Sequence, residues 1–289
     1  MFSILTKQAQ QTKNSMERSK RALERKSQAS GDGKDQSPSR DASTEQQTDR
    51  KDGEEEDEPK PLGRMASVQL ISFDMPRTFS LLQFFDVNGP LYPGLQSVLE
   101  AYVVYRPDLG YVQGMSFLAS MLLLNMEPPA AFQVLANILN LPCEKAFYGM
   151  DVARIDAYAL AVDKMIAEYM PRIGKIFKKF EISSRMFLLE WVMTLYAKAL
   201  PLDIAAHVWD LFMLDGEIVI FRVAVALVHL FRNELIYATF DQAVTLLNNI
   251  PQEILDESLF ESIAAVNFSH KKWDAILKAS IEEVAKQQP

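Results

Sequence analysis

The stretch YRPDLGYVQGMSFLASMLLLN, residues 105–125, decides the fold of this chain because it joins a turn to an apolar helix. Pro107 disfavours helical angles at the residue before it, and Asp108 and Gly110 are turn formers. After the turn, apolar side chains recur at the i, i+3, i+4 spacing of a buried helical face and fill most other positions too. We therefore expect a central helix of a helical domain over residues 113–125.

Gln113 and Gly114 are unusual at the start of so apolar a helix. Glycine costs about 1 kcal/mol relative to alanine inside a helix, so Gly114 indicates that another group approaches the backbone there. One interpretation is that a neighbouring helix makes this approach, and that Gln113 only caps the helix or faces water. The other is that Gln113 has a function, and spacing alone favours the first.

Helical patterns continue on both sides of this stretch, and no strand pattern of comparable length competes with them. Asp151 is a candidate helix cap, and Pro76 limits any helix in the first apolar segment. The sequence predicts an all-α fold of about ten helices without a fixed repeat. The expected helices cover residues 94–105, 113–125, 128–139, 152–170, 172–180, 184–199, 202–213, 218–237, 240–249, 257–266 and 271–286.

The chain divides into three parts by composition. Residues 1–28 can form a helix but contain too few apolar side chains to bury one alone, so they dock on another part or fray. Residues 29–63 are polar and end in an acidic run at 54–58, which predicts a disordered loop or linker. An acidic docking segment is the alternative, although no motif supports it. Residues 64–289 form the ordered domain.

Composition excludes several classes of function. The net charge of −8 and the acidic body argue against nucleic-acid binding, which needs a clustered basic face. The single cysteine, Cys143, excludes an intramolecular disulfide framework and fits a reducing compartment. His207, His229 and His270 have no second ligand at metal spacing, so no metal site is expected. The chain also lacks a phosphate-binding GxxxxGK[ST] loop, a GxSxG nucleophile motif and a stretch of membrane-spanning length.

Three blocks of sequence, in order, resemble the signature of TBC-domain proteins, the GTPase-activating proteins of Rab GTPases. They are ISFDMPRTF at residues 71–79, YVQGM at 111–115 and LPLDIAAHVWD at 200–210. The resemblance covers roughly residues 66–278, and the middle block is most similar to the branch linked to recycling endosomes and autophagosome formation. It implies a TBC-type domain of two helical lobes, which we expect to divide near residues 180–200.

The resemblance assigns catalytic roles to two residues. Arg77 matches the arginine finger of the family and Gln113 the glutamine finger. An arginine is always charged and can span two phosphoryl oxygens, whereas a glutamine amide both donates and accepts and can therefore orient a water. Such groups, supplied by a partner, accelerate GTP hydrolysis by on the order of 10³ to 10⁵.

Supporting roles follow for other residues of the first two blocks. Asp74, three residues before the finger, is expected to hold the guanidinium in place, with a helix cap as the alternative. Thr78 completes the same block. Tyr111 and Gly114 are expected to shape the surface around the glutamine.

The third block is expected to be mainly structural. Pro201 and Trp209 match the family pattern, and Asp210 is expected to bind backbone or a cation beside the large side chain. Two positions depart from the pattern. His207 stands where the family usually has arginine, which makes any polar network there weaker or titratable, and Ser80 stands where proline is common.

The resemblance also implies partners and a location. The expected partner is a Rab-family GTPase in its GTP-bound state. GTP and Mg²⁺ belong to that partner, so the chain needs no cofactor and is not an enzyme by itself. We expect a cytoplasmic protein that reaches endosomal or other vesicle membranes through the Rab. The family's usual start of the domain has no match, so residues 1–28 are expected to be a helical remnant of the first lobe. The alternative function is a scaffold that binds a Rab or an adaptor without catalysis.

Overall fold

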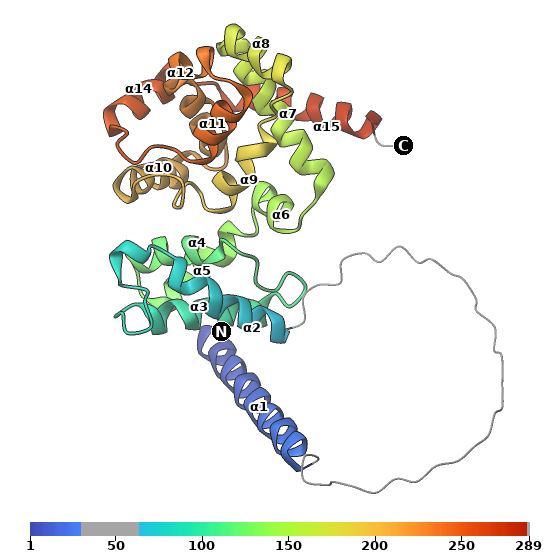
Figure 1. Ribbon diagram of the computed structural model, residues 1–289, viewed down its shortest axis with the longest axis vertical. Coiled ribbons are helices and arrows are strands. Elements are labelled where there is room, and N and C mark those ends of the chain that lie inside the picture. The colour runs from blue at the N-terminus through green and yellow to red at the C-terminus, as the bar shows by residue number, and fades with distance from the viewer. Residues whose placement is uncertain (30–63, 288–289) are drawn as a thin grey trace, which may run out of the picture.

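The structure, a computed structural model, describes residues 1–29 and 64–287. These ranges contain fifteen α-helices and two short 3₁₀ helices, η1 and η2, and no strand. The all-α prediction is therefore confirmed. Figure 1 shows the helices gathered in two lobes along the long axis of the molecule.

The first lobe comprises α1 (Phe2–Ala29), α2 (Arg64–Asp74), η1 (Met75–Arg77), η2 (Ser80–Leu82), α3 (Tyr92–Tyr105), α4 (Met115–Leu123) and α5 (Pro128–Ile138). The second lobe comprises α6 (Pro142–Tyr148), α7 (Val152–Tyr169), α8 (Pro171–Phe180), α9 (Arg185–Met193), α10 (Leu202–Asp215), α11 (Ile218–Leu230), α12 (Arg232–Tyr237), α13 (Phe240–Asn248), α14 (Asp256–Ala265) and α15 (His270–Gln287).

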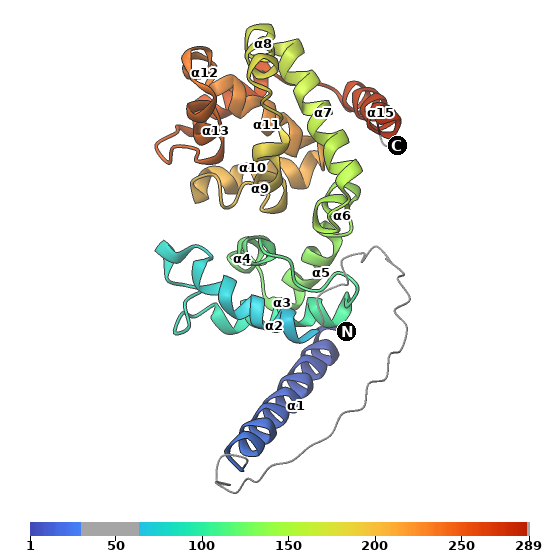
Figure 2. The same ribbon diagram turned by 45° about the vertical axis from the view of Figure 1, so that its right-hand side comes forward.

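The boundary between the lobes lies between α5 and α6, at residues 139–141. Helix α3 packs against α1, α2, α4 and α5, whereas α7 packs against α8, α11 and α15. The expected division near residues 180–200 is therefore wrong, because α7 and α8 already belong to the second lobe. Figures 1 and 2 show the same separation from two directions.

The N-terminal helix docks on the first lobe and extends beyond it. It contacts α3 and α5, and the ring of Phe2 lies 5.5 Å from the ring of Phe132. Ala9 is buried, and Lys13 forms an ion pair with the buried Glu100 of α3. Figure 2 shows the rest of α1 leaving the lobe. The expected disordered segment, residues 29–63, lies outside the described residues from residue 30 onward.

Several helices differ from their predicted bounds. The pattern over residues 184–199 yields only α9, because Leu195 and Tyr196 adopt φ angles of +43° and +64°, which no helix accommodates. Two hydrogen bonds hold this turn: Trp209 Nε1 donates to the Leu195 carbonyl at 3.0 Å, and Tyr196 Oη donates to the Ile220 carbonyl at 2.5 Å. Residues 218–237 form two helices instead of one, and the short helices α2 and α6 were not expected.

Stacked aromatic rings join the helices of the second lobe. The ring of Phe221 lies 5.1 Å from that of Tyr158 on α7 and 4.3 Å from that of Trp273 on α15. Such pairs add about 1 kcal/mol each to the burial of their area, so they fix α7, α11 and α15 against one another. Within the described ranges, no helix combines the length and the apolar character needed to span a bilayer.

Candidate functional site

A cavity of about 420 Å³ lies between the two lobes. The first lobe lines it with Asp74, Arg77, Val112, Gln113, Gly114 and Phe117. The second lobe lines it with Met150, Leu189, Glu190, Met193, Thr194 and Lys198. Both predicted fingers therefore open onto one cavity, although 36 positions separate them in the sequence. The facing wall comes from α9 and the turn that follows it.

Gln113 lies in the turn before α4 and not in the helix. The helix begins at Met115, and Gly114 precedes it with a φ of +102°, a conformation that glycine adopts far more readily than other residues. The expected helix start at residue 113 is therefore wrong by two positions. As a result, the Gln113 side chain is exposed at the cavity and does not continue the apolar face of α4.

The group that approaches Gly114 comes from the other lobe. A methyl group added at Gly114 would lie 3.6 Å from Thr194 Cγ2 and 3.7 Å from the Met193 carbonyl oxygen. These are ordinary van der Waals distances, so the positive φ, more than crowding, requires glycine here. The approach predicted from the sequence exists, and it comes from the C-terminal end of a neighbouring helix, α9, whose last residue is Met193 and whose C-cap is Thr194.

Asp74 binds the turn that carries Gln113. Its Oδ2 accepts hydrogen bonds from Tyr111 Oη, from the Gly114 backbone N–H at 3.3 Å and from Ser116 Oγ at 3.1 Å. Asp74 makes no ion pair with Arg77 in the part of the chain that the structure describes. The expected contact of Asp74 with the guanidinium is therefore not seen, and the hydrogen bonds of its carboxylate go instead to the turn of Gln113 and the first turn of α4.

A second pair of hydroxyls continues this network. Thr78 Oγ1 donates to Ser116 Oγ at 2.7 Å and also lies 3.1 Å from the Asp74 carbonyl oxygen. Thr78, Ser116 and Asp74 are all buried, where each unpaired polar group would be costly. Burial and the adjacent Asp74 carboxylate raise the pKa of Tyr111, so its hydroxyl remains a donor. Ser116 was not predicted as a site residue. The sequence could have indicated it through its polar side chain in the first turn of an otherwise apolar helix.

Arg77 is the last residue of η1 and is exposed. Its Nε donates to the Phe73 carbonyl at 3.2 Å, which fixes the inner part of the guanidinium. Both terminal nitrogens are without a hydrogen-bonding partner among the described residues. The guanidinium is therefore held through Nε alone. Its two terminal nitrogens are available at the cavity, where they could donate to two oxygens of an anionic group.

The turn after Arg77 is held by aromatic contacts. Phe79 adopts a φ of +47°, and its ring packs edge-on against that of Phe117, 5.3 Å away, and against that of Phe85. Phe117 also lines the cavity. Ser80, which stands where the family commonly has proline, begins η2 and is exposed.

The second lobe's wall carries an ion pair at the cavity. Lys198 binds Glu190, and both side chains are partly exposed. Thr194 Oγ1 donates to the Glu190 carbonyl at 2.9 Å, and Tyr148 Oη donates to the Met193 carbonyl. This wall could not be predicted from the sequence, since its residues belong to none of the three motif blocks that carry the resemblance.

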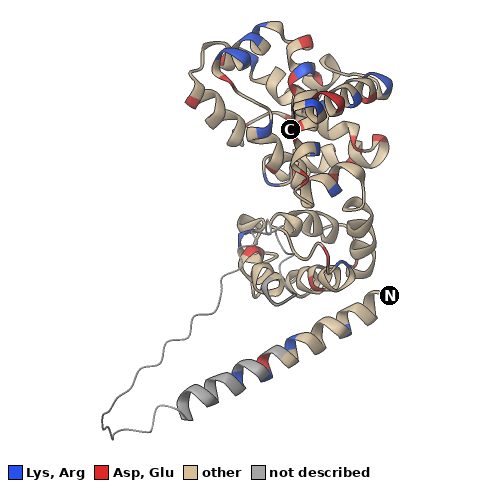
Figure 3. Ribbon diagram, turned by 90° about the vertical axis from the view of Figure 1, so that its right-hand side faces the viewer, with Lys and Arg blue, Asp and Glu red and all other residues tan. Residues whose placement is uncertain are grey.

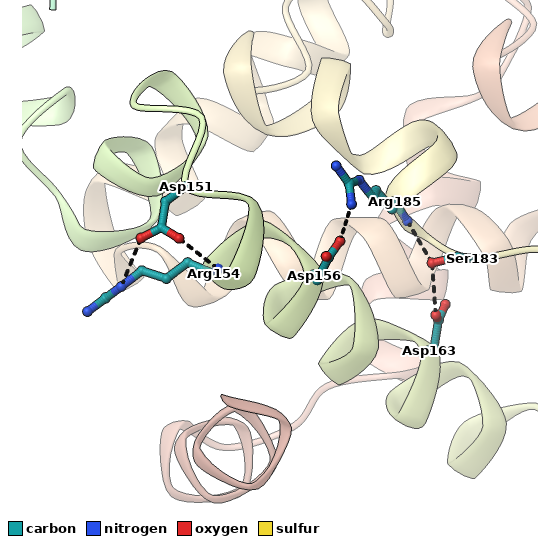
Figure 4. Close-up of polar contacts among 6 residues, drawn as sticks. All are labelled: Asp151, Arg154, Asp156, Asp163, Ser183 and Arg185. Atoms are coloured by element: carbon teal, nitrogen blue, oxygen red, sulfur yellow. Dashed lines mark hydrogen bonds and ion pairs between the residues drawn. The ribbon is translucent and has the colours of Figure 1, made fainter. Parts of the chain in front are cut away.

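Figure 4 shows polar contacts at the start of α7, and between α7 and the segment at the start of α9. Helix α9 carries part of the second lobe's wall, so these contacts hold that wall against α7. Asp151 caps α7 by accepting from the Arg154 backbone N–H at 3.1 Å. Arg185, the first residue of α9, binds Asp156 of α7. Ser183 Oγ donates to Asp163 Oδ2 at 3.3 Å. Burial raises the pKa of Asp163, while its hydrogen bonds to Ser184 and Ser183 oppose the shift.

No residue of the third motif block, residues 200–210, lines the cavity. Pro201 precedes α10, and the buried Trp209 bonds to the turn at Leu195 described above. Asp210 is exposed and makes no hydrogen bond or ion pair with any described residue, so its expected contact is absent. His207 binds Asp256, with Nδ1 3.0 Å from Oδ2, and this hydrogen bond raises the pKa of the histidine.

The donor set of the cavity suits an anionic ligand and not a metal ion. In the described residues, no three His, Cys, Asp or Glu side chains gather at metal-binding distance. The cavity instead offers the open guanidinium of Arg77 and the amide of Gln113, while the ammonium of Lys198 is paired with Glu190. These groups can neutralise charge on oxygen and orient a water.

Comparison with known sequences identifies relatives. The sequence model of the Rab-GTPase-TBC domain matches residues 7–236. Drainin of Dictyostelium discoideum is 42% identical over 213 residues, 73% of this chain and 49% of Drainin. TBC1 domain family member 12 of Xenopus tropicalis is 40% identical over 222 residues, 76% of this chain and 32% of the relative. TBC1 domain family member 14 of Homo sapiens is 40% identical over 218 residues, with shares of 75% and 32%.

This chain therefore spans between about a third and a half of the length of these relatives. The match to the domain model begins inside α1, earlier than the resemblance expected from residue 66, and ends in α12. The earlier start agrees with the packing of α1 against α3 and α5.

Two solved structures share the fold. The Chlamydomonas flagellar RabGAP TBC domain has a TM-score of 0.52 and 21% identity, over 75% of this chain and 69% of that structure. The Ypt/Rab-GAP domain of Gyp1p has a TM-score of 0.54 and 13% identity, over 78% of this chain and 75% of that structure. At these identities the likeness concerns the fold alone.

Proposed function

Because this chain belongs to the Rab-GTPase-TBC domain family, we propose that it activates a Rab-family GTPase by supplying Arg77 and Gln113 to the GTP held by that partner. The observation that carries the proposal is that both side chains open onto the same cavity between the lobes. The cavity's open guanidinium and exposed amide are the two kinds of group that a slow GTPase lacks.

Arg77 and Gln113 have different roles in the proposed reaction. The Arg77 fork binds oxygens on which charge develops as the phosphoryl group transfers, and its charge does not depend on pH near neutrality. The Gln113 amide accepts from the attacking water and donates to the phosphoryl group or the partner's backbone. Since both act mainly on the transition state, they raise the rate of hydrolysis more than the affinity for the GTPase.

Asp74 supports this chemistry through the glutamine. Its carboxylate fixes Tyr111, Gly114 and Ser116, and thereby the short turn from which Gln113 projects. A catalytic group held to within a fraction of an ångström loses little entropy when the partner docks. The arginine needs less support because its Nε is already bound to the Phe73 carbonyl in the last turn of α2.

The proposed partner is a GTP-bound Rab, which brings its own Mg²⁺ and nucleotide. We further propose that the protein acts in the cytoplasm on vesicle traffic, at endosomal or autophagy-linked membranes, in keeping with its similarity to TBC1 domain family members 12 and 14. The identity of the Rab depends on surface detail outside the two fingers.

A single-turnover assay across a panel of GTP-loaded Rab GTPases tests the proposal. We expect acceleration of at least two orders of magnitude for one Rab or a few, and none for the others. A chain that binds a GTP-loaded Rab tightly without accelerating hydrolysis would instead be a scaffold. Absence of both binding and acceleration over the whole panel would reject the proposed function.

A further inference from the structure

Helix α8, whose sequence is PRIGKIFKKF, has one apolar and one cationic face. Ile173 and Phe177 are buried against the second lobe. On the other side, four cations are exposed within ten residues, and the helix contains no acidic residue. The cations are Arg172, Lys175, Lys178 and Lys179.

This cationic face is unusual within an acidic chain. The net charge of the chain is −8, and three other lysines of the second lobe form ion pairs: Lys164 with Glu283, Lys198 with Glu190 and Lys272 with Glu168. None of the four α8 cations forms an ion pair with a described residue. Glu181 follows directly after the helix and is exposed. The face therefore concentrates positive charge that the fold itself does not neutralise.

The position of α8 exposes it to a large partner. Figures 1 and 2 show α8 at the end of the long axis opposite α1, and Figure 3 shows Lys and Arg gathered at this end. Helix α12 packs against α8 and ends at Tyr237, whose exposed fraction is 86%. Phe240, three residues beyond α12, is also exposed. Exposed aromatic rings beside lysines are typical of surfaces that enter the interfacial layer of a bilayer.

We propose that the α8 face, defined as Arg172, Lys175, Lys178 and Lys179, binds the surface of a membrane that contains anionic lipids, and that the exposed Tyr237 of the adjacent helix α12 adds a second contact. The cations meet the negative lipid headgroups, and the tyrosine inserts its ring among them. This contact is independent of the two fingers and adds to any attachment through a GTPase.

Sedimentation with lipid vesicles tests the proposal. The probes are large vesicles of phosphatidylcholine with 30% phosphatidylserine and vesicles of phosphatidylcholine alone, at low and at physiological salt. We expect binding to the first kind only, and weaker binding as salt screens the charges. Each Lys or Arg near an anionic surface raises the partition coefficient about fivefold, so Lys175→Gln with Lys178→Gln should lower it about 25-fold.

The matched control is Lys271→Gln with Lys278→Gln, which removes the same charge from two exposed lysines of α15. This control should lower binding much less, and both variants should melt at the temperature of the unchanged protein. Tyr237→Ser should weaken binding to a similar degree at both salt concentrations, because burial of the ring is not screened.

Three results would overturn the proposal. One is an equal loss in both double variants, which would indicate a response to net charge alone. Another is equal binding to neutral and anionic vesicles. The third is absence of binding by the unchanged protein.

Discussion

The Asp74 carboxylate accepts a hydrogen bond from the backbone N–H of Gly114 across 3.3 Å, and this contact joins the two motifs that carry the proposed fingers. Asp74 ends α2 immediately before the 3₁₀ turn of Arg77, while Gly114 directly follows Gln113. The two fingers are therefore parts of one hydrogen-bonded unit, whose members can be tested separately.

Replacing Arg77 by alanine should lower the stimulated rate of hydrolysis by at least two orders of magnitude, about 3 kcal/mol in transition-state stabilisation. Arg77→Lys should also be poor, because an ammonium cannot reproduce the planar fork. The residue is exposed, so helical content by circular dichroism should not change. Full activity of Arg77→Ala would refute the arginine-finger assignment.

Gln113 should replace the water-positioning glutamine of the partner. A Rab whose own catalytic glutamine is changed to alanine should therefore still be stimulated by the unchanged protein, and Gln113→Ala should abolish this stimulation. Binding to the GTP-loaded Rab should weaken only modestly, because the amide acts on the transition state. If that Rab binds tightly but is not stimulated by the unchanged protein, Gln113 is an ordinary interface residue.

Asp74→Ala should lower stability by about 3 kcal/mol, since three buried donors lose their acceptor at an expected cost on the order of 1 kcal/mol each. Tyr111→Phe, which removes one of these donors, should cost about 1 kcal/mol in the same urea titration. The catalytic effect of Asp74→Ala should largely disappear in a Gln113→Ala background. If Asp74→Ala lowers the stimulated rate as much in the Gln113→Ala background as in the unchanged protein, Asp74 acts through Arg77 and not through Gln113.

Gly114→Ala should destabilise the protein by about 1 to 2 kcal/mol through its positive φ, because the added methyl group meets Thr194 only at 3.6 Å. The loss of GTPase stimulation should exceed that of Gly216→Ala, a control glycine that also has a positive φ, of +79°, but lies in open space outside the cavity lining. Equal stimulation by these two variants would show that the turn tolerates other geometries.

His207 should titrate above its ordinary pKa of 6.5, because Asp256 accepts its hydrogen bond and favours the charged ring. A raised pKa in the folded state adds stability below the unfolded pKa, and this contribution is lost as pH rises through the folded pKa. Histidine proton NMR should show the shift, and Asp256→Asn should move the pKa back toward 6.5. Both side chains are largely exposed, so the effect on stability should be small.

The sequence predicted the helical class because apolar spacing is a local property of each helix. It could not predict the boundary between the lobes, since this depends on which helices α7 contacts, far along the chain. It also missed the end of α9, where Trp209 and Ile220 hold a turn with two positive φ angles. Tertiary hydrogen bonds overrode the local helical preference there.

The candidate site was predictable in part. The motifs placed Arg77 and Gln113 in the chain, and the structure places both at one cavity. The sequence suggested Arg77, three residues later, as the partner of Asp74. In the structure, the Asp74 carboxylate instead accepts a hydrogen bond from the turn at Gly114, 40 residues away. The opposite wall, with Glu190 and Lys198, has no sequence signature because it belongs to none of the matched motif blocks.

The cavity between the lobes has one further consequence. The proposed chemical groups all lie on the first lobe's wall, while the facing wall consists of Met150, Leu189, Met193, Thr194 and the Glu190–Lys198 pair. Under the proposed function, we expect substitutions in the facing wall to change which GTPase is accepted and to leave the two fingers intact. Partner choice and catalytic power would then reside on separate halves of the molecule, so that one could diverge while the other is retained.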